Sequence, residues 1–477
     1  MNIDASQDLG KDAEKVKTIY QQSSINPSIV GQLIHARRDI HISQARGLCS
    51  RVYRIPSGLI RNTEQGEEQL CIKRVDEDDQ YAPHAVAREV LAYSLIGNVD
   101  RTKGGEFIMN LLAAFKDESD DFSTLYDLAM PWYPCTLQDL LDEPHFQINR
   151  STNGSGAGPT RADDEPRPAL QIAKSVIDPI AFIRTVTFQL FSALSFLHAN
   201  GIAHRDVKPT NILLKTDGTN DIQLIDFGTC FLSHNRYIPG DDGKGGLASE
   251  VGTGAYRAPE CLLSPLNGYD PYKVDVWQAG VTLAEFFLPL QSKVSKEDHQ
   301  NEYHSDEEDV AKNSDSHLEW ERALWSKDHG QGWTDLHDRF ENIQGHSDDF
   351  FSVIDNRQPK LQQQEGQSSH TRQTLFEGSR GDLGLANSIF DILGLPNGDA
   401  QGEAEWPEAV HFQPSLARLP FKRRLPRDGG LKGYLSEFVS EESGKKLNDA
   451  LDVLQESIQL SANRRIDASK AIEQLLI

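Results

Sequence analysis

Residues 202–214 read IAHRDVKPTNILL. Between two short apolar runs they hold a histidine, an arginine, an aspartate, a lysine and an asparagine. A buried charge is unfavourable unless it is paired, so such a cluster rarely belongs to a plain core strand. The cluster is therefore either a polar surface loop or a loop whose carboxylate, amine and amide face one reacting centre.

The composition indicates a protein with a large core and no disulfide framework. Of its 477 residues, 38% are hydrophobic, and the five cysteines include no C-x-x-C pair. The formal charge of -24 excludes general nucleic-acid binding, which needs a basic surface. The polar start is not a signal peptide, and no apolar run approaches the roughly 18 residues of a membrane span. We expect a reducing compartment, the nucleus or the cytoplasm, and no membrane association.

The pattern along the chain predicts a small sheet-rich region followed by a larger helical one. Residues 1–35 are polar and are expected to form a flexible tail. Alternating apolar residues predict strands, with one helix, over 36–130, and helical periodicity dominates 131–477. An Asp-Pro start and apolar spacing predict a buried helix over 178–201. Low-complexity composition predicts two disordered insertions, at residues 143–175 and 293–372.

Four further motifs accompany residues 202–214. CIKRV contains Lys73, VAREV contains Glu89, IDFG contains Asp226 and GTGAYRAPE contains Thr253. The ordered set resembles the signature of eukaryotic protein kinases, and five motifs in order are far more specific than one. The resemblance implies an α+β, bilobal protein kinase fold over residues 36–477, with a β-rich N-lobe and a larger, mainly helical C-lobe.

The resemblance implies three catalytic residues for phosphoryl transfer, a reaction that depends on positioning and on charge neutralisation. Asp206 would accept the proton of the substrate hydroxyl. Lys208 would contact the γ-phosphate, and a lysine here is typical of serine/threonine kinases. Thr253 resembles the threonine that hydrogen-bonds both of them. Neighbouring motif residues would be structural: His204 would pack, and Phe227 would plug the core.

The resemblance implies a site for ATP and Mg²⁺ as well. Lys73, paired with Glu89, would hold the α- and β-phosphates, although these two residues taken alone would be read as an exposed ion pair. Asn211 and Asp226 offer the oxygen ligands that Mg²⁺ prefers.

The loop expected to cover the phosphates departs from the family pattern G-x-G-x-x-G-x-V. It reads ARGLCSRV, so Gly47 and Val52 match while Ala45 and Ser50 replace the outer glycines. A Cβ at those positions restricts the approach of the backbone to phosphate. We expect weakened but retained ATP binding, and an active kinase.

Two segments resemble the CMGC kinases and, among them, the cyclin-dependent kinases. Arg257 follows the tyrosine of YRAPE, and residues 374–410 carry LF-G, LG-P and WP elements. The resemblance covers residues 38–142, 176–292 and 373–477. It also implies that Glu260 and Arg465 form a buried, structural ion pair.

The activation segment lacks features of typical cyclin-dependent kinases. The position of their phosphorylated threonine, nine residues before Arg257, is Ala248, with Ser249 as an alternative acceptor. Of three arginines that usually clamp the phosphate, Arg88 and Arg205 match and the third position is Phe231. These departures predict a segment that is ordered without modification. Asp241 or Asp242 could supply a fixed negative charge there.

Together the departures most resemble the single-subunit CDK-activating kinases of fungi. The resemblance implies a monomer that phosphorylates the activation-loop threonine of cyclin-dependent kinases without a cyclin. One alternative is a cyclin-partnered kinase acting on Ser/Thr-Pro sites, and another is a catalytically dead scaffold. The basic run FKRRLPR, residues 421–427, is a solvated loop, a contact for an acidic partner or a nuclear address.

Overall fold

The structure is a computed structural model. It describes three ranges, residues 16–233, 247–293 and 369–476, with gaps at 39, 41–42, 48, 57, 61–68, 81, 121–122, 149–166, 264, 266, 397–404, 413–414 and 420. The chain divides into two compact units, Met1–Gln291 with Thr371–Ile477, and Ser292–His370. The elements that form the site belong to the first unit.

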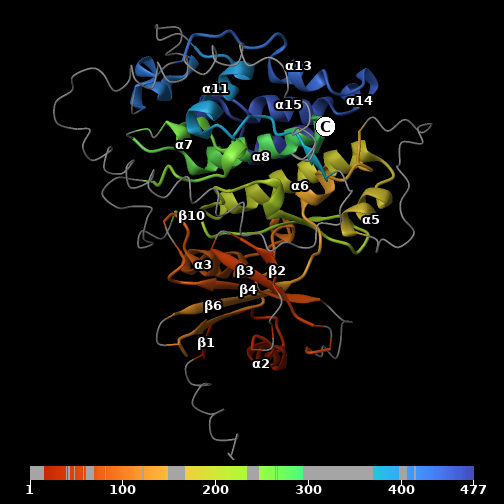
Figure 1. The fold of residues 1–477 in the computed structure, drawn as a ribbon, viewed down its shortest axis with the longest axis vertical. Helices are drawn as coiled ribbons and strands as arrows, with labels where there is room; N and C mark the ends of the chain where they lie inside the picture. Colours follow the sequence, from red (N-terminus) through yellow and green to blue (C-terminus); the bar gives the residue numbers. More distant parts are fainter. Residues whose placement is uncertain are drawn as a thin grey trace, which may run out of the picture. The chain divides into compact units, whose positions relative to one another are not determined.

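The N-lobe is a six-stranded antiparallel sheet with one long helix beside it (Figure 1). Its strand order is β1-β5-β6-β4-β3-β2. Lys73 lies in the middle of β4, opposite Val52 on one side and Leu128 on the other. The bounds are β1 Val16–Gln21, β2 Ser43–Arg46, β3 Ser50–Arg54, β4 Leu70–Asp76, β5 Ala113–Asp117, β6 Leu125–Pro131 and helix α3 Val86–Gly97.

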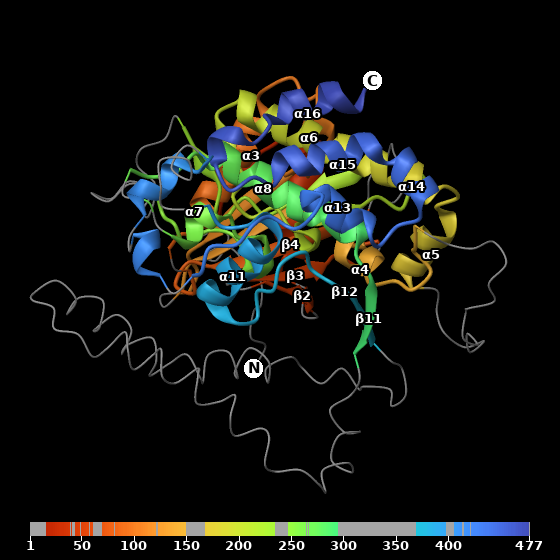
Figure 2. The same ribbon diagram turned by 90° about the horizontal axis from the view of Figure 1, so that it is seen from above.

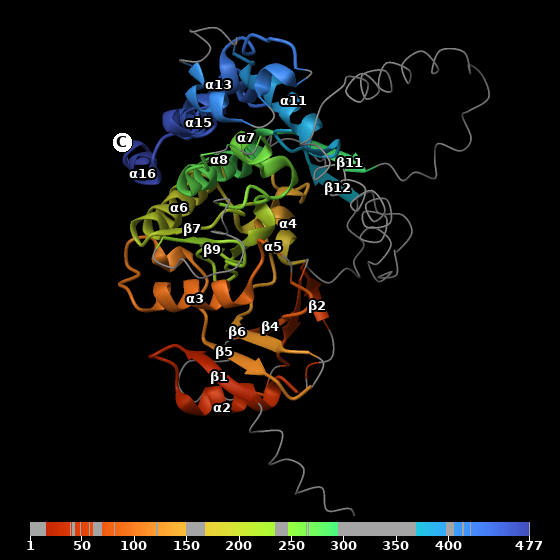
Figure 3. The ribbon, with the colours of Figure 1, turned by 90° about the vertical axis from the view of Figure 1, so that its left-hand side faces the viewer.

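The prediction of a flexible tail over residues 1–35 is wrong for residues 16–35, and residues 1–15 lie outside the described part. Strand β1 pairs with β5, and helix α2, Pro27–Ala36, lies against the sheet near β1 and β5 (Figure 3). The Asn26 side chain accepts a hydrogen bond from the amide of Ser28 and caps α2. Val30 and Leu33 pack on buried residues of β3–β6 and form a second, smaller core. Burial against the sheet, which is a long-range effect, orders this polar segment.

A buried ion-pair network holds the end of α2 to the sheet. Arg37 Nε lies 2.6 Å from the Asp127 carboxylate, and Arg74 Nε lies 2.6 Å from the other oxygen of the same carboxylate. Arg37 also pairs with Asp117 at 2.5 Å. Asp127 is fully buried, so these charge-assisted bonds replace its lost hydration.

The C-lobe is mainly helical, with α8 packed against α6 and α15, and α6 against α16 (Figure 2). The α-helices are α4 Leu137–Leu141, α5 Pro168–Ser175, α6 Pro179–Ala199, α7 Pro259–Leu262, α8 Pro271–Ala284, α11 Gly381–Leu393, α13 Gly430–Ser436, α14 Glu441–Lys446, α15 Asn448–Ser457 and α16 Ala468–Leu475. Short strands pair as β7 with β10, β8 with β9 and β11 with β12: β7 Ile202–Ala203, β8 Ile212–Leu214, β9 Ile222–Leu224, β10 Phe231–Leu232, β11 Leu290–Lys293, β12 Ser369–Arg372. The 3-10 helices are η1 Gly105–Phe107, η2 Pro209–Asn211, η3 Gly254–Tyr256, η4 Glu285–Phe287, η6 Pro407–His411, η7 Leu416–Arg418 and η8 Ala462–Arg464.

Helix α6 confirms the predicted buried helix but contradicts the statement that no segment is long and apolar enough to cross a membrane. It has 21 residues, and its most apolar window has a mean hydropathy of 1.6. Of that window, 67% is buried inside the protein. Asp178 caps its start by accepting hydrogen bonds from the amides of Ile180 and Ala181. Its apolar surface is explained by burial against α8 and α16.

The two predicted insertions are structured at their ends. Within 143–175, helix α5 forms, and residues 149–166 lie outside the described part. Within 293–372, β12 forms, and residues 294–368 lie outside the described part. Arg372 is buried and donates hydrogen bonds to the carbonyls of Leu141, Phe146 and Leu288. Local composition could not reveal this, because the partners of Arg372 are far away in the chain.

Candidate active site

Lys73 joins the two lobes at the centre of the site. Its position on β4 brings Nζ within 2.8 Å of both carboxylate oxygens of Glu89, on α3. The same nitrogen lies 2.8 Å from Oδ1 of Asp226, which follows β9 in the C-lobe. The side chain of Glu89 is 3% exposed and that of Lys73 12%, so this is no surface ion pair. The pairing places α3 against the cleft.

The three groups tune one another electrostatically. Burial by itself would lower the pKa of Lys73, but the charges of Asp226 and Glu89 outweigh it and raise this pKa. Burial would raise the pKa of Asp226, and the ammonium of Lys73 instead holds it well below its usual range. Burial raises the pKa of Glu89 despite the opposing effect of Lys73. The site therefore keeps a protonated amine beside an ionised aspartate at neutral pH.

The loop of residues 204–211 is fixed by polar side chains of α8. The Asp275 carboxylate accepts hydrogen bonds from the amides of His204, at 2.8 Å, and Arg205, at 2.6 Å. Gln278 Oε1 accepts from the amide of Val207 at 2.9 Å. Arg205 is held at φ 65°, an unfavourable conformation for a residue with a Cβ. Side chains of α8 thus fix the conformation of the loop backbone through several hydrogen bonds.

The predicted catalytic residues converge at this loop. Lys208 Nζ lies 2.8 Å from Asp206 Oδ2 and 2.7 Å from the hydroxyl of Thr253. That hydroxyl donates to Asp206 Oδ1 at 2.7 Å. Asn211 Nδ2 donates to the backbone carbonyl of Asp206 at 2.9 Å and to its carboxylate at 3.1 Å. The Asp206 carboxylate is oriented from several sides and remains available as a proton acceptor.

Phe227 is fully buried beside the site. Its ring centroid lies 5.0 Å from that of Tyr93 on α3 and 4.9 Å from that of His204. His204 is also buried, and its Nε2 lies 2.8 Å from the carbonyl of Ile225. Both residues therefore occupy packing positions, with Phe227 linking α3 to the catalytic loop.

The residues that would bind a divalent metal ion fit that purpose chemically. Asn211 and Asp226 supply oxygen atoms, and the carbonyl of Asn211 accepts the amide of Ile225 at 3.0 Å, which holds the two segments together. The Asp226 side chain is 37% exposed toward the cleft. In the described ranges no group of three or more His, Cys, Asp or Glu residues could hold a metal by itself. Such a sparse donor set suits Mg²⁺, which keeps waters and phosphate oxygens as ligands.

The glycine-containing loop is the turn between β2 and β3. The amide of Gly47 donates to the carbonyl of Ser50 at 2.9 Å, and a Cβ on Gly47 would lie 2.6 Å from the Ser50 hydroxyl. Ala45 pairs with Val52 inside the strands, where an extended backbone accepts a Cβ. Gly47 and Ser50 line a small cavity together with Lys73 and Asp226. Replacement of the outer glycines therefore does not distort the hairpin.

The two predicted phosphate-clamp arginines are buried and bonded to other groups. Arg205 Nε donates to the carbonyl of Thr229 at 2.7 Å, and Nη1 lies 3.2 Å from the hydroxyl of Tyr269. That hydroxyl donates to the carbonyl of Ala248 at 2.5 Å. Arg88 Nη1 donates to the carbonyl of Pro83 at 2.8 Å. Phe231 lies in β10, and Asp241 and Asp242 fall outside the described residues.

Sequence reasoning missed several residues that support the site. Asp275 and Gln278 carry a detectable signal, since both are polar within the apolar stretch KVDVWQAG. Tyr256 donates to Glu285 Oε1 at 2.5 Å, and burial raises the pKa of Glu285 to about 8.

The predicted ion pair of Glu260 with Arg465 forms with distances of 2.6 and 2.7 Å, buried in the C-lobe.

Comparison with known proteins agrees with this geometry. The family described as protein kinase domain matches residues 169–360. CBL-interacting protein kinase 4 of Oryza sativa subsp. japonica is 45% identical over 105 residues, which are 22% of this chain and 21% of that protein. The MAPK/MAK/MRK overlapping kinase of Homo sapiens is 39% identical over 119 residues, or 24% of this chain and 25% of that protein.

Mitogen-activated protein kinase 15 of Xenopus laevis is 30% identical over 204 residues, which are 41% of this chain and 33% of that protein. The chain therefore matches a third or less of the length of each of these relatives. The family match covers much of the C-lobe, and the six-stranded sheet with Lys73 and Glu89 completes the α+β, bilobal arrangement. Residues 169–360 thus match the protein kinase domain family, and the described residues have the bilobal α+β arrangement of a protein kinase fold.

Proposed function

We propose that the protein is an ATP-dependent serine/threonine kinase that uses Mg²⁺ and phosphorylates other proteins. Protein kinase domains use ATP and a divalent metal ion in general. The observation that carries the proposal is the pairing of Lys73 with Glu89 and Asp226, formed while Thr253 bridges Asp206 and Lys208. These contacts connect both lobes around one cleft.

Each residue of the cleft then has a defined task. Lys73 binds phosphate oxygens, and Glu89 orients its amine. Asp206 accepts the proton of the substrate hydroxyl as its oxygen bonds to the γ-phosphorus of ATP, while the bond from that phosphorus to the departing oxygen of ADP breaks. Lys208 neutralises charge on the transferred group. Asn211 and Asp226 would hold Mg²⁺, which supplies charge neutralisation when bound. Thr253 keeps Asp206 and Lys208 at a fixed separation.

The direct test is phosphorylation of a protein substrate by the purified full chain with Mg-ATP. We expect incorporation on serine or threonine, and a loss of about 10³-fold in the D206N variant, because the amide cannot accept the proton. Thermal unfolding of D206N should match the wild type. Equal rates for the two proteins would contradict the assignment, and absence of any turnover would favour a scaffold.

We further propose that the substrate is the activation-loop threonine of cyclin-dependent kinases, and that the enzyme acts as a monomer without a cyclin. In support, Ala248 replaces the usual phosphorylated threonine, and Arg205 is already bonded to Thr229 and Tyr269. Strand β1 also supplies a contact to α3 from the same chain, since Tyr20 packs on Gly97. The relatives named as mitogen-activated kinases agree with a CMGC assignment. The proposed location is the nucleus or the cytoplasm.

A peptide array and a cyclin titration distinguish this proposal from a cyclin-partnered kinase. A CDK-activating kinase should phosphorylate an unphosphorylated cyclin-dependent kinase and require no proline after the acceptor. A preference for Ser/Thr-Pro peptides, or an increase of about tenfold on adding a cyclin, would favour the cyclin-partnered alternative.

A further inference from the structure

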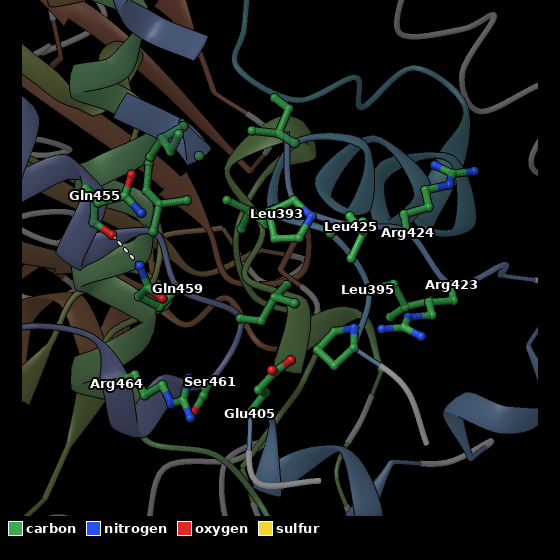
Figure 4. Close-up of a pocket in the computed structure, with 18 residues that line it drawn as sticks. Leu393, Leu395, Glu405, Arg423, Arg424, Leu425, Gln455, Gln459, Ser461 and Arg464 are labelled. Atoms are coloured by element: carbon green, nitrogen blue, oxygen red, sulfur yellow. Dashed lines mark hydrogen bonds between the residues drawn. The ribbon is translucent and has the colours of Figure 1, made fainter. Parts of the chain in front are cut away.

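A second cavity lies in the C-lobe, outside the catalytic cleft. Its volume is about 420 Å³, and it lies between the end of α11, residues 423–426 and the segment from Gln455 to Arg464. In Figure 4, Arg423 and Arg464 lie on opposite sides of the cavity. None of the residues assigned to phosphoryl transfer lines it.

One wall of the cavity is the segment of residues 423–427, called the strap below, which is hydrogen-bonded to the end of α11. The amide of Leu395 donates to the carbonyl of Arg424 at 2.8 Å, and the amide of Arg427 donates to the carbonyl of Ile392 at 3.1 Å. Gly394 has a φ of 77°, and a Cβ there would lie 2.6 Å from the nitrogen of Pro426. Only glycine allows so close an approach, so the wall is preformed.

The cavity combines a buried apolar base with an exposed apolar rim. Leu395, Leu431 and Ile458 are buried lining residues. Leu425, held between the two bonded ends of the strap, is 75% exposed. An aliphatic side chain from another molecule would bury the base and cover Leu425, each at a gain of about 25 cal/mol per Å².

The lining is basic although the whole chain has a net charge of -24. It contains three arginines and one glutamate, Glu405. Arg424 pairs with Asp391, which holds the strap, whereas Arg423 is exposed and has no ion-pair partner within the described residues. Two of the four cations of residues 421–427 are thus structural, because Arg427 pairs with Glu437. The run is therefore more than a solvated loop.

We propose that this cavity binds a short peptide segment of a partner protein, in which an aliphatic side chain is flanked by aspartate or glutamate. The aliphatic group enters the cavity, and a flanking carboxylate pairs with Arg423. Charge complementarity between the basic rim and the acidic flanks favours this occupant over a basic peptide. Binding goes beyond the proposed phosphoryl transfer and does not depend on it.

The test uses the full chain and an array of short random peptides. Enriched peptides should pair an aliphatic residue with aspartate or glutamate. A fluorescent peptide of the enriched sequence should bind with a Kd on the order of 10 µM, more weakly in high salt. R423E should weaken it about tenfold, while K422E, with the same charge change just outside the lining, should stay within about twofold. A peptide with lysine in place of its acidic residue should recover binding to R423E.

Several results would overturn the proposal. One is enrichment of basic, uncharged or phosphorylated peptides over carboxylate-bearing ones, and another is no enrichment at all. Equal weakening by K422E and R423E would show a diffuse charge effect. An R423E-sensitive dimer, seen by light scattering, would show that a second copy of the chain occupies the cavity. Matching thermal unfolding of both variants excludes misfolding as the cause.

Discussion

The catalytic loop and helix α3 supply the two halves of the active site, but they are held in different ways. The loop is bonded through its backbone to Asp275 and Gln278, which are fully buried in the same lobe. Helix α3 is held to β4 by the Lys73–Glu89 pair, and it is held across the cleft by the Lys73–Asp226 pair and by the ring of Tyr93 against Phe227. The C-lobe half is therefore part of the fold itself, whereas the N-lobe half depends on contacts that can open without unfolding.

The N-terminal segment adds a third contact to the N-lobe half. Tyr20 of β1 approaches Gly97 at the end of α3 so closely that a Cβ on Gly97 would lie 2.6 Å from its hydroxyl. Asn110 donates to the side chain of Gln22, the residue that follows β1, at 2.8 Å and ties the end of that strand to the loop before β5. A segment that looks like a tail in the sequence thus contributes to the position of α3.

The largest effect is expected at the C-lobe anchor. Asp275→Ala removes the acceptor of two buried amides, which should lower the free energy of unfolding by about 3 kcal/mol and abolish detectable activity. Denaturant unfolding with a parallel kinase assay measures both. Asp275→Asn, which keeps one acceptor oxygen, should lose less stability. Unchanged stability in the alanine variant would show that α8 does not fix the loop.

Glu89→Gln should separate activity from stability. We expect activity to fall about 10²-fold because Lys73 loses its orienting charge, while the free energy of unfolding changes by less than about 1 kcal/mol. In this variant Lys73 keeps Asp226 as its ion-pair partner, and the neutral amide at position 89 removes the unfavourable burial of a charge. Glu441→Gln, in an exposed pair with Lys445, is the matched control and should change neither. A loss of stability as large as that of Asp275→Ala would show that the Lys73–Glu89 pair is as important for folding as the α8 anchor, and would contradict the difference between the two halves.

Tyr20→Ala tests the contribution of β1 to α3. Loss of the ring should lower kcat about fivefold and the melting temperature by a few degrees, since α3 keeps its other contacts. Ile19→Ala, at an exposed position of the same strand, should have little effect on either quantity. Gly97→Ala should reproduce the Tyr20 effect from the opposite side. An unaltered kcat in both Tyr20→Ala and Gly97→Ala would contradict a contribution of β1 to the position of α3.

Glu285 predicts a pH dependence in the C-lobe half. Its carboxyl ionises in the unfolded chain from about pH 4.5, but burial delays ionisation in the folded protein until about pH 8. Stability that is present below pH 4.5 is therefore lost as the pH rises toward 8. Glu285→Gln keeps the bond from Tyr256 and cannot ionise, so its melting temperature should exceed that of the wild type by about 5 °C at pH 8 and by little at pH 5. Parallel melting curves would contradict the burial effect.

The smallest effect is expected in the activation segment. Phosphatase treatment, or Ser249→Ala, should leave kcat within about twofold, because Arg205 is already bonded to Thr229 and Tyr269. Tyr269→Phe should lower kcat more than Ser249→Ala, since it removes the bond to Ala248. An enzyme silenced by phosphatase would show that a phosphate on this segment is required.

Much of the site could be predicted from the sequence, because its chemistry is carried by short motifs. Asp206, Lys208 and Asn211 lie within one loop, so their proximity follows from local spacing. Lys73 and Asp226 were predicted to meet only through the family resemblance, and the structure places them 2.8 Å apart. The supporting residues Asp275 and Tyr269 had no motif, since their partners are far away in the chain.

The sequence alone determined the sheet-rich first region, the helical second region and the buried helix α6, because apolar periodicity is a local property. The bilobal fold and the reactive side chains followed from the resemblance of its short motifs to those of protein kinases. Only the tertiary structure decided that residues 16–36 join the sheet, that α8 holds the catalytic loop, and that the basic strap forms a cavity. Each of these depends on contacts between distant segments. Burying a polar side chain is favourable only when a distant segment supplies its hydrogen-bond or ion-pair partner, and the local sequence does not show that partner.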